Sequence, residues 1–396
     1  MRDPDPRAWG TGTPVERDVA TGHLSPSPHL PPLGVSRFAQ AFQFALAAMT
    51  VACGPARPAA PPTPVAGAVA AAKAWPIKTR EHVDLWLHGF ALVTDDNSKV
   101  PLFARGYRDA MTVTKNARQL FTKLDEGRAE LSRRYRSNPA YQGAQFAALY
   151  FGSLPELMQA AQLAVTMDGD PRKATTREAQ AIFTLFNGWF PNKADREWFR
   201  LFLDALNDEQ VRFYHDWWVA QQRERSAALA AIESGWITTR PRLQAFLAGT
   251  KQPTGDFLVS LPLEGEGRTV REGAQVVIAT GFPATAANGA EAMFTFVHEA
   301  VAALAEGQVA DQSSPADRRS GTADKLLALA TVRGGAMLLA VAAPEQVGAY
   351  QRFYLRTAGV PAPAGDVSAL FEATFAIPDA VRDGMKQQID ILLGGI

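Results

Sequence analysis

The sequence predicts a mainly α-helical fold, in which a helical N-terminal half precedes a small α+β C-terminal half of antiparallel strands and helices. Two observations support this prediction. Apolar residues recur at three- and four-residue intervals from residue 70 to residue 247. Between residues 257 and 280 the pattern changes to two short apolar runs, and helical spacing then returns. A chain of 396 residues is long enough for two or three domains with substantial cores.

The composition excludes several classes of protein. Forty Lys and Arg balance forty Asp and Glu, so no overall positive field exists to attract nucleic acid. Hydrophobic residues make up 47% and charged residues 20%, which excludes a wholly disordered chain. The single cysteine, Cys53, excludes both an intrachain disulfide and a cysteine-based zinc cluster.

The N-terminal segment indicates export. Residues 1–36 are proline-rich and predict a disordered extension. In residues 37–53 an arginine precedes an apolar stretch that ends in small residues and Cys53, which is typical of a secretory signal. Residues 50–53, Thr-Val-Ala-Cys, resemble the lipobox of bacterial lipoproteins, with Thr50 in place of the usual large aliphatic residue.

That resemblance implies a lipid-modified Cys53, a membrane as partner, and a location facing the periplasm or the cell surface. Residues 54–72 fit it as a stiff Pro/Ala-rich tether. The alternative is a short helix that contains an incidental cysteine.

In the predicted helical domain, residues 73–250, proline-containing breaks should end helices at Pro139, Pro155, Pro171 and Pro191. An aromatic stripe from Trp198 to Trp218 should pack in the core, because its spacing is that of a buried helix face. The segment 99–136 holds ten Lys or Arg and four Asp or Glu. It predicts either a solvated helix face or a surface towards anionic lipid.

In the predicted C-terminal domain, residues 251–396, the runs 257–263 and 275–280 indicate a small antiparallel sheet or hairpin. Pro262 favours an edge position because proline lacks a backbone N–H. Four helices should follow, at residues 287–305, 324–342, 344–357 and 378–393.

His298 and Glu299 lie on the first of these helices, after the predicted strand. A His-Glu-x-x-His helix places two zinc-binding histidines on one face and a general-base glutamate beside them. The sequence matches the first two positions and has Ala302 in place of the second histidine. Residues 331–339, with Arg333-Gly334-Gly335-Ala336, resemble the Glu-Gly-x-Ala helix of the gluzincin metallopeptidases, with arginine in place of the third ligand.

This resemblance to the gluzincins spans residues 256–345 and implies a zincin-like domain that has lost its metal. A catalytic zinc needs three protein ligands, and only His298 remains. We therefore expect no metal and no cofactor, and a Glu299–Arg333 ion pair in place of the metal charge. The resulting hypothesis is an exported envelope lipoprotein with a non-catalytic binding or scaffolding role.

Two other hypotheses stay open. The first is a metal-dependent hydrolase that uses His298 and Glu299 with atypical ligands, drawn from Asp311, Asp317 or Asp324. The second is a purely structural helical protein, in which His298 and Glu299 are an ordinary capping or surface pair.

Overall fold

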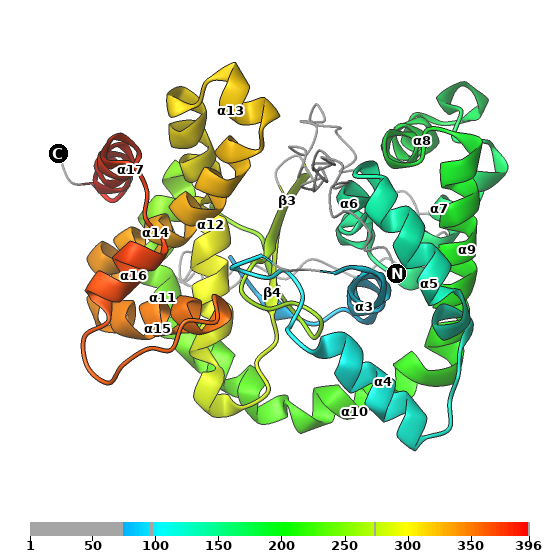
Figure 1. The fold of residues 1–396 in the computed structure, drawn as a ribbon, viewed down its shortest axis with the longest axis horizontal. Helices are drawn as coiled ribbons and strands as arrows, with labels where there is room; N and C mark the ends of the chain where they lie inside the picture. The colour runs from blue at the N-terminus through cyan, green and yellow to red at the C-terminus, as the bar shows by residue number, and fades with distance from the viewer. Residues whose placement is uncertain (1–73, 96–97, 273–274, 395–396) are drawn as a thin grey trace, which may run out of the picture.

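The computed structural model describes residues 74–95, 98–272 and 275–394. The predictions for the N-terminal extension, the signal and Cys53 lie outside these residues. The described chain is mainly helical and contains one four-stranded sheet, so the coarse fold class is confirmed. Figure 1 shows helices α3 to α9 on one side and α11 to α17 on the other, with strands β3 and β4 between them.

The N-terminal group begins with α3, whose residues are almost all buried in the protein. Each predicted proline break lies at an element boundary: Pro139 precedes α6, Pro155 lies in the first turn of α7, Pro171 begins a 3-10 turn, and Pro191 separates α8 from α9. The helices of this part are α3 (Glu81–Val93), α4 (Tyr107–Ala117), α5 (Lys123–Ser137), α6 (Ala140–Ala144), α7 (Leu154–Thr166), α8 (Arg177–Trp189), α9 (Lys193–Glu209), the π-helical turn η3 (Gln210–Tyr214), α10 (His215–Glu224) and α11 (Ser226–Gly249).

Aromatic side chains build the core of this group, as the stripe on α9 to α10 predicted. Trp198 stacks on Phe202 with ring centroids 5.2 Å apart, and Trp86 of α3 meets Phe202 edge-to-face at 5.5 Å. Trp217 is buried as well, whereas Trp218 is half-buried. Such ring pairs stabilise a core beyond the apolar area that they bury.

The sheet has the strand order β1-β2-β4-β3, with β1 (Ile77–Lys78), β2 (Asp256–Ser260), β3 (Arg268–Glu272) and β4 (Gln275–Gly281). The prediction that the two apolar runs pair antiparallel is wrong, because β2 and β4 are parallel. The antiparallel hairpin is β3–β4 instead. The polar sequence of β3, Arg-Thr-Val-Arg-Glu, gave no strand signal. Because β3 runs back between the two apolar runs, β4 can lie parallel to β2.

The edge assignment based on Pro262 is also wrong. Strand β2 lies between β1 and β4, in the interior of the sheet. It tolerates the proline because the strand ends at Ser260, and Pro262 follows in a turn. There the Pro262 carbonyl accepts a hydrogen bond from the Ala104 N–H, at 2.8 Å.

The C-terminal helices are α12 (Ala290–Gln312), α13 (Pro315–Arg319), α14 (Thr322–Ala342), α15 (Val347–Thr357), α16 (Ser368–Thr374) and α17 (Asp379–Leu392). Helix α12 packs lengthwise on α14 and also against β4. Among the described helices α14 alone is long and apolar enough to cross a membrane by length and composition, with a mean hydropathy of 1.6. Half of that apolar window is buried inside the protein, as expected of a core helix.

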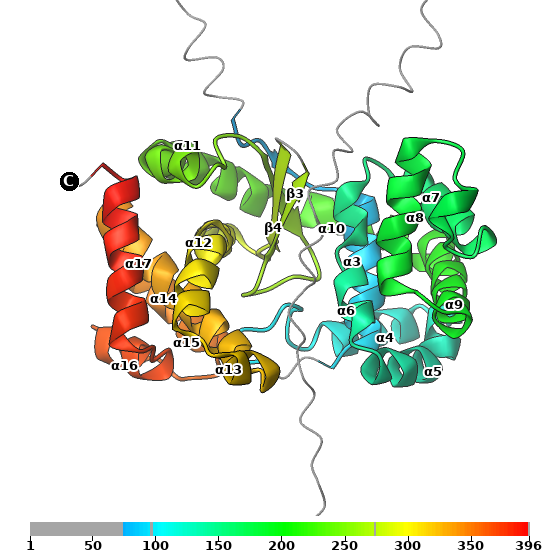
Figure 2. The same cartoon turned by 90° about the horizontal axis from the view of Figure 1, so that it is seen from above.

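The two groups of helices share one apolar core. A contiguous cluster of buried side chains extends from Ala74 to Ile389, across the boundary predicted at residue 250. Strand β1 pairs with β2, and α11 packs against α12 and α17, so segments of the N-terminal half complete the C-terminal part. Seen from above, in Figure 2, α11 lies beside α12 and α17.

Candidate functional site

His298 and Glu299 form a buried pair on α12. The His298 Nδ1 atom lies 3.2 Å from Glu299 Oε1, and the two side chains are only 7% and 8% exposed. The other carboxylate oxygen, Oε2, accepts a hydrogen bond from the Thr269 hydroxyl at 3.1 Å. Helix α12 is buried here because it packs on both α14 and the sheet, and β3 brings Thr269 to it.

The loop from β2 to β3 closes tightly over this pair. A Cβ atom at Gly267 would lie 2.8 Å from Glu299 Cγ and 2.5 Å from the Ala279 carbonyl oxygen, so only glycine fits. On the other side, the Tyr354 ring stacks on the His298 ring with centroids 5.6 Å apart. The Tyr354 hydroxyl donates to the Gly265 carbonyl at 3.2 Å. The two glycines of Gly265-Glu266-Gly267 therefore allow the close approach of the loop to α12 and α15.

Electrostatics keep Glu299 ionised despite its burial. Burial disfavours the carboxylate, but the surrounding groups, His298 foremost, together outweigh this cost and hold the pKa of Glu299 below its usual value. The charge of Arg268 and the Thr269 hydroxyl act in the same direction.

The structure does not bring Arg333 to Glu299, and the expected ion pair between them is not formed. Arg333 Nη2 instead lies 3.1 Å from Glu372 Oε1 of α16. Its guanidinium carbon is 5.9 Å from the centroid of the Phe371 ring. Although α12 and α14 pack together, the Arg333 side chain extends to α16, where its partner is 61% exposed to solvent.

The atypical ligand set proposed for a hydrolase is not assembled either. Asp311 lies on α12, thirteen residues after His298, which is about 20 Å along a helix. Asp317 caps α13 by accepting bonds from Ser314, and Asp324 lies on α14. Among residues 74–95, 98–272 and 275–394, no three His, Cys, Asp or Glu side chains come close enough to hold a metal ion. The residues around His298 therefore do not fit a zinc ion with three protein ligands.

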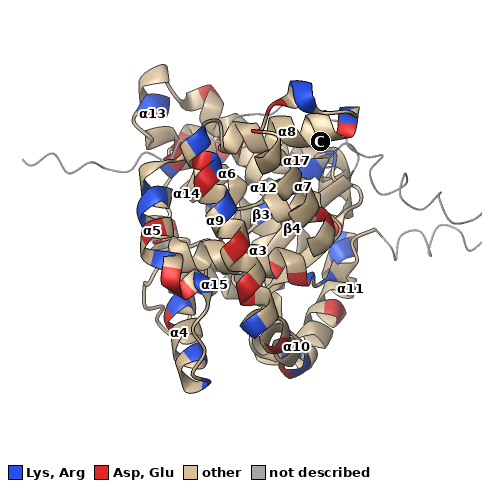
Figure 3. Cartoon of the chain, turned by 90° about the vertical axis from the view of Figure 1, so that its right-hand side faces the viewer, with Lys and Arg blue, Asp and Glu red and all other residues tan. Residues whose placement is uncertain are grey.

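Four of the ten basic side chains in segment 99–136 pair with acids from outside the segment. Lys115 is buried, Lys123 pairs with Asp204 at 2.9 Å, and Arg108 and Arg136 both pair with Asp95. Figure 3 shows acidic and basic residues interspersed over α4 and α5. This arrangement is that of a solvated helix face rather than of a continuous positive surface.

A second histidine–carboxylate pair, which the sequence motifs did not indicate, lies inside the N-terminal group. His88 Nε2 of α3 is 3.0 Å from Glu209 Oε1 of α9, and both side chains are fully buried. Lys115 Nζ lies 2.6 Å from the same carboxylate and 2.9 Å from Asp125 Oδ2. The His88 Nδ1 atom meets the Tyr107 hydroxyl at 3.0 Å. No local motif could reveal this cluster, since His88 and Glu209 are 121 residues apart.

A buried carboxylate also joins α3 to the sheet. Asp84 accepts hydrogen bonds from the Ser260 hydroxyl at 2.5 Å and from the Trp218 indole N–H at 2.8 Å. Complete burial raises the pKa of Asp84 to about 7. Asp84 is therefore the protonatable link between α3, α10 and β2.

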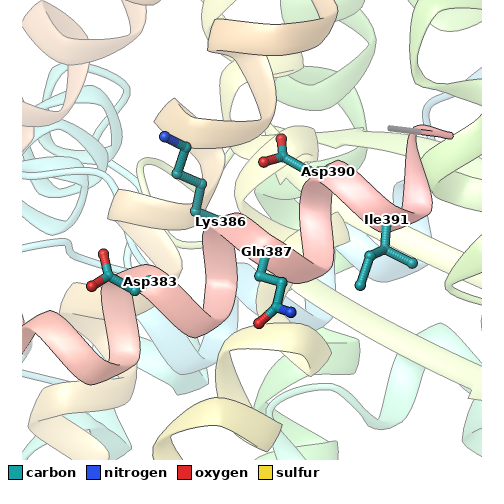
Figure 4. Close-up of a pocket in the computed structure, with 5 residues that line it drawn as sticks. All are labelled: Asp383, Lys386, Gln387, Asp390 and Ile391. Carbon is teal, nitrogen blue, oxygen red and sulfur yellow. The ribbon is translucent and has the colours of Figure 1, made fainter. Parts of the chain in front are cut away.

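Two shallow hollows on the described surface lie away from His298. Figure 4 shows one of them on α17, where side chains from one helix face project outwards. These side chains are Asp383, Lys386, Gln387, Asp390 and Ile391. The other lies at the C-terminal end of α15 and the loop after it. Neither holds a constellation of acid, base and nucleophile that would indicate catalysis.

No protein-family profile matches the chain, and no similar protein is found among curated proteins or among solved structures. Function is therefore inferred from the geometry of the chain itself.

Proposed function

We propose that this protein is a non-catalytic envelope protein, with a binding or scaffolding role, whose C-terminal part resembles a zincin without its metal. One observation carries the proposal. Both oxygens of Glu299 are already bonded within the protein, to His298 and to Thr269. A metallopeptidase needs that carboxylate free to polarise a metal-bound water.

The chemistry of the neighbouring positions supports the same proposal. Ala302, which stands in place of the second histidine of the motif, has no ligating atom. With its polar groups bonded to one another, the His298–Glu299 pair can serve as a polar element of the core that fixes α12 against β3.

Metal analysis tests the proposal directly. Protein purified without chelator should contain far less than one equivalent of zinc, manganese, iron or cobalt by mass spectrometry. It should also show no chelator-sensitive hydrolysis of a casein substrate. Stoichiometric metal together with hydrolysis that is lost in Glu299→Gln would overturn the proposal. Thr269→Val provides a matched control, because it leaves every possible ligand in place.

We propose further that Cys53 carries the lipid anchor. The support is the apolar stretch before Cys53 and the Pro/Ala-rich segment after it. Expressed in a bacterial host with labelled palmitate, the wild-type chain should take up label and Cys53→Ala should not. Equal labelling of the two chains would exclude lipidation at this residue.

A further inference from the structure

We infer that Arg268, at the start of β3, binds the carboxylate of a ligand. The inference deepens the proposed binding role, on which it rests, because it names the chemical group that would be bound. Arg268 precedes Thr269, which bonds Glu299, but its own side chain lies over Phe146 and does not form part of the His298–Glu299 pair. The geometry of its guanidinium group is what indicates a ligand.

The Arg268 guanidinium lies over an aromatic ring and forms no ion pair with an acidic residue in the described part of the chain. Its central carbon is 4.1 Å from the centroid of Phe146, a buried ring just before the 3-10 turn at residues 147–150. The Nε atom is buried and has no hydrogen-bond partner among the residues that the structure describes. Among the described residues, no carboxylate forms an ion pair with Arg268 within 4 Å. Stacking on a ring leaves the in-plane N–H donors of a guanidinium free for a ligand.

The backbone holds this side chain in place from both sides. Gly267, the preceding residue, packs against Glu299 and the Ala279 carbonyl with no room for a side chain. Thr269, the following residue, bonds Glu299 on the α12 side of the sheet. Because successive strand residues point to opposite faces, Arg268 is directed away from α12 and towards Phe146. Its position is thus set before any ligand arrives.

The local charge favours a carboxylate over a phosphate. A guanidinium fork can bind either group through two parallel hydrogen bonds. Arg268 carries one positive charge, and its field already acts on the ionised Glu299 close by. Glu299 repels a singly charged carboxylate less than a doubly charged phosphate, so the carboxylate is the favoured ligand.

Titration with small carboxylates tests the inference. The readout is the Nε–Hε proton resonance of Arg268, assigned by its loss in Arg268→Gln. The probes are N-acetylglycine, which mimics a peptide C-terminus, N-acetylaspartate α-amide, which mimics an acidic side chain, and N-acetylglycine amide, which carries no charge. We expect a saturable shift with one or both acids and none with the neutral amide. The acid that binds more tightly shows whether the natural carboxylate is a peptide C-terminus or an acidic side chain.

Substitutions complete the test. Because Arg268→Gln lacks the Nε–Hε resonance, binding by the variants is compared with that by the wild type by calorimetric titration. Arg268→Gln should weaken binding of the tighter acid by about tenfold or more, as expected on loss of a charge-assisted hydrogen bond. Arg271→Gln, on an exposed position of the same strand, should leave it unchanged. Phe146→Leu keeps the arginine and should weaken binding less, which covers the case in which Arg268→Gln fails to fold. Inorganic phosphate should bind more weakly than the tighter acid.

Equal shifts with the acid and its amide, no shift at high probe concentration, or unchanged affinity in both Arg268→Gln and Phe146→Leu would overturn the inference. If the protein is still free of metal, any of these results disproves only the inferred carboxylate site and leaves the proposed function standing. Stoichiometric metal with chelator-sensitive hydrolysis would instead disprove the proposed non-catalytic function, whatever Arg268 binds.

Discussion

Two buried histidine–carboxylate pairs in the described part of the chain differ in how they are built. His298 and Glu299 are neighbours on one helix, with a single hydroxyl, Thr269, as the third member. His88 and Glu209 come from different helices, and Lys115 approaches their carboxylate at 2.6 Å. The first pair has a sequence motif and few partners, whereas the second has no motif and several partners.

The difference follows from the cost of burying charge. An ionised group deep in a protein is tolerated only with opposite charge or several hydrogen bonds around it. Glu209 is fully buried, yet its pKa falls to about 2, because His88 and Lys115 more than offset the burial. A conspicuous motif therefore need not mark the place where charge contributes most to the fold.

The largest expected effect is that of Glu209→Gln. It leaves Lys115 in the core with Asp125 as its one remaining acidic partner within 4 Å among the described residues. Removing one member of such a buried cluster should lower the free energy of unfolding by about 3 to 5 kcal/mol. Urea denaturation at pH 7 measures this. Glu197→Gln, which breaks a solvent-exposed pair with Arg200, is the control and should lower the free energy of unfolding far less. Similar losses of unfolding free energy in the two variants would show that the buried cluster stabilises the fold no more than an exposed ion pair does.

Asp84→Asn tests the carboxylate between α3 and the sheet. The folded-state pKa of about 7 lies above the unfolded value, so the native protein holds a proton that the unfolded chain releases. Wild-type stability should therefore fall as pH rises from about 4 to about 7. Between pH 5 and pH 8 the decline attributable to Asp84 should be of order 3 kcal/mol, at 1.36 kcal/mol per pKa unit.

The amide introduced by Asp84→Asn cannot ionise, so the difference in unfolding free energy between wild type and variant should shift in favour of the variant over that range. Denaturant titrations at several pH values measure this difference. A constant difference from pH 5 to pH 8 would show that Asp84 does not titrate there.

Glu299→Gln makes the corresponding change in the His298–Glu299 pair, so its cost can be compared with that of Glu209→Gln. The amide keeps the shape of the side chain and can still accept from Thr269, but it loses the charge-assisted contact with His298. We expect a loss of about 1 to 3 kcal/mol in unfolding free energy, less than for Glu209→Gln. If the loss exceeded that of Glu209→Gln, the pair on α12 would be the stronger of the two.

Arg333→Ala should have the smallest effect. Its partner Glu372 is 61% exposed, so solvent screens the ion pair, which is worth about 0 to 1 kcal/mol. A double-mutant cycle with Glu372→Ala isolates the pair from the packing of Arg333 on Phe371. A coupling energy of about 3 kcal/mol or more would show instead that Arg333 lies in a buried pair.

Local chemistry in the sequence predicted the helices and where they break. Prolines at residues 139, 155, 171 and 191 lie at element boundaries, because proline restricts its own φ and the preceding residue. The aromatic face around Trp198 is buried because a helix of that periodicity has one apolar side. The positions of β2 and β4 could be predicted because each is a short apolar run in the sequence.

Only the tertiary structure decided which segments meet. The direction of strand pairing depended on β3, a polar strand without an apolar pattern. Glu299 is bonded to His298 and Thr269 rather than to Arg333, since the packing of the elements places side chains by geometry that a motif does not contain. The cluster at Glu209 joins residues as far as 121 positions apart, and such contacts form only when the whole chain is compact. Sequence periodicity determines which face of an element is buried, but the arrangement of the elements selects the partner of each buried charge.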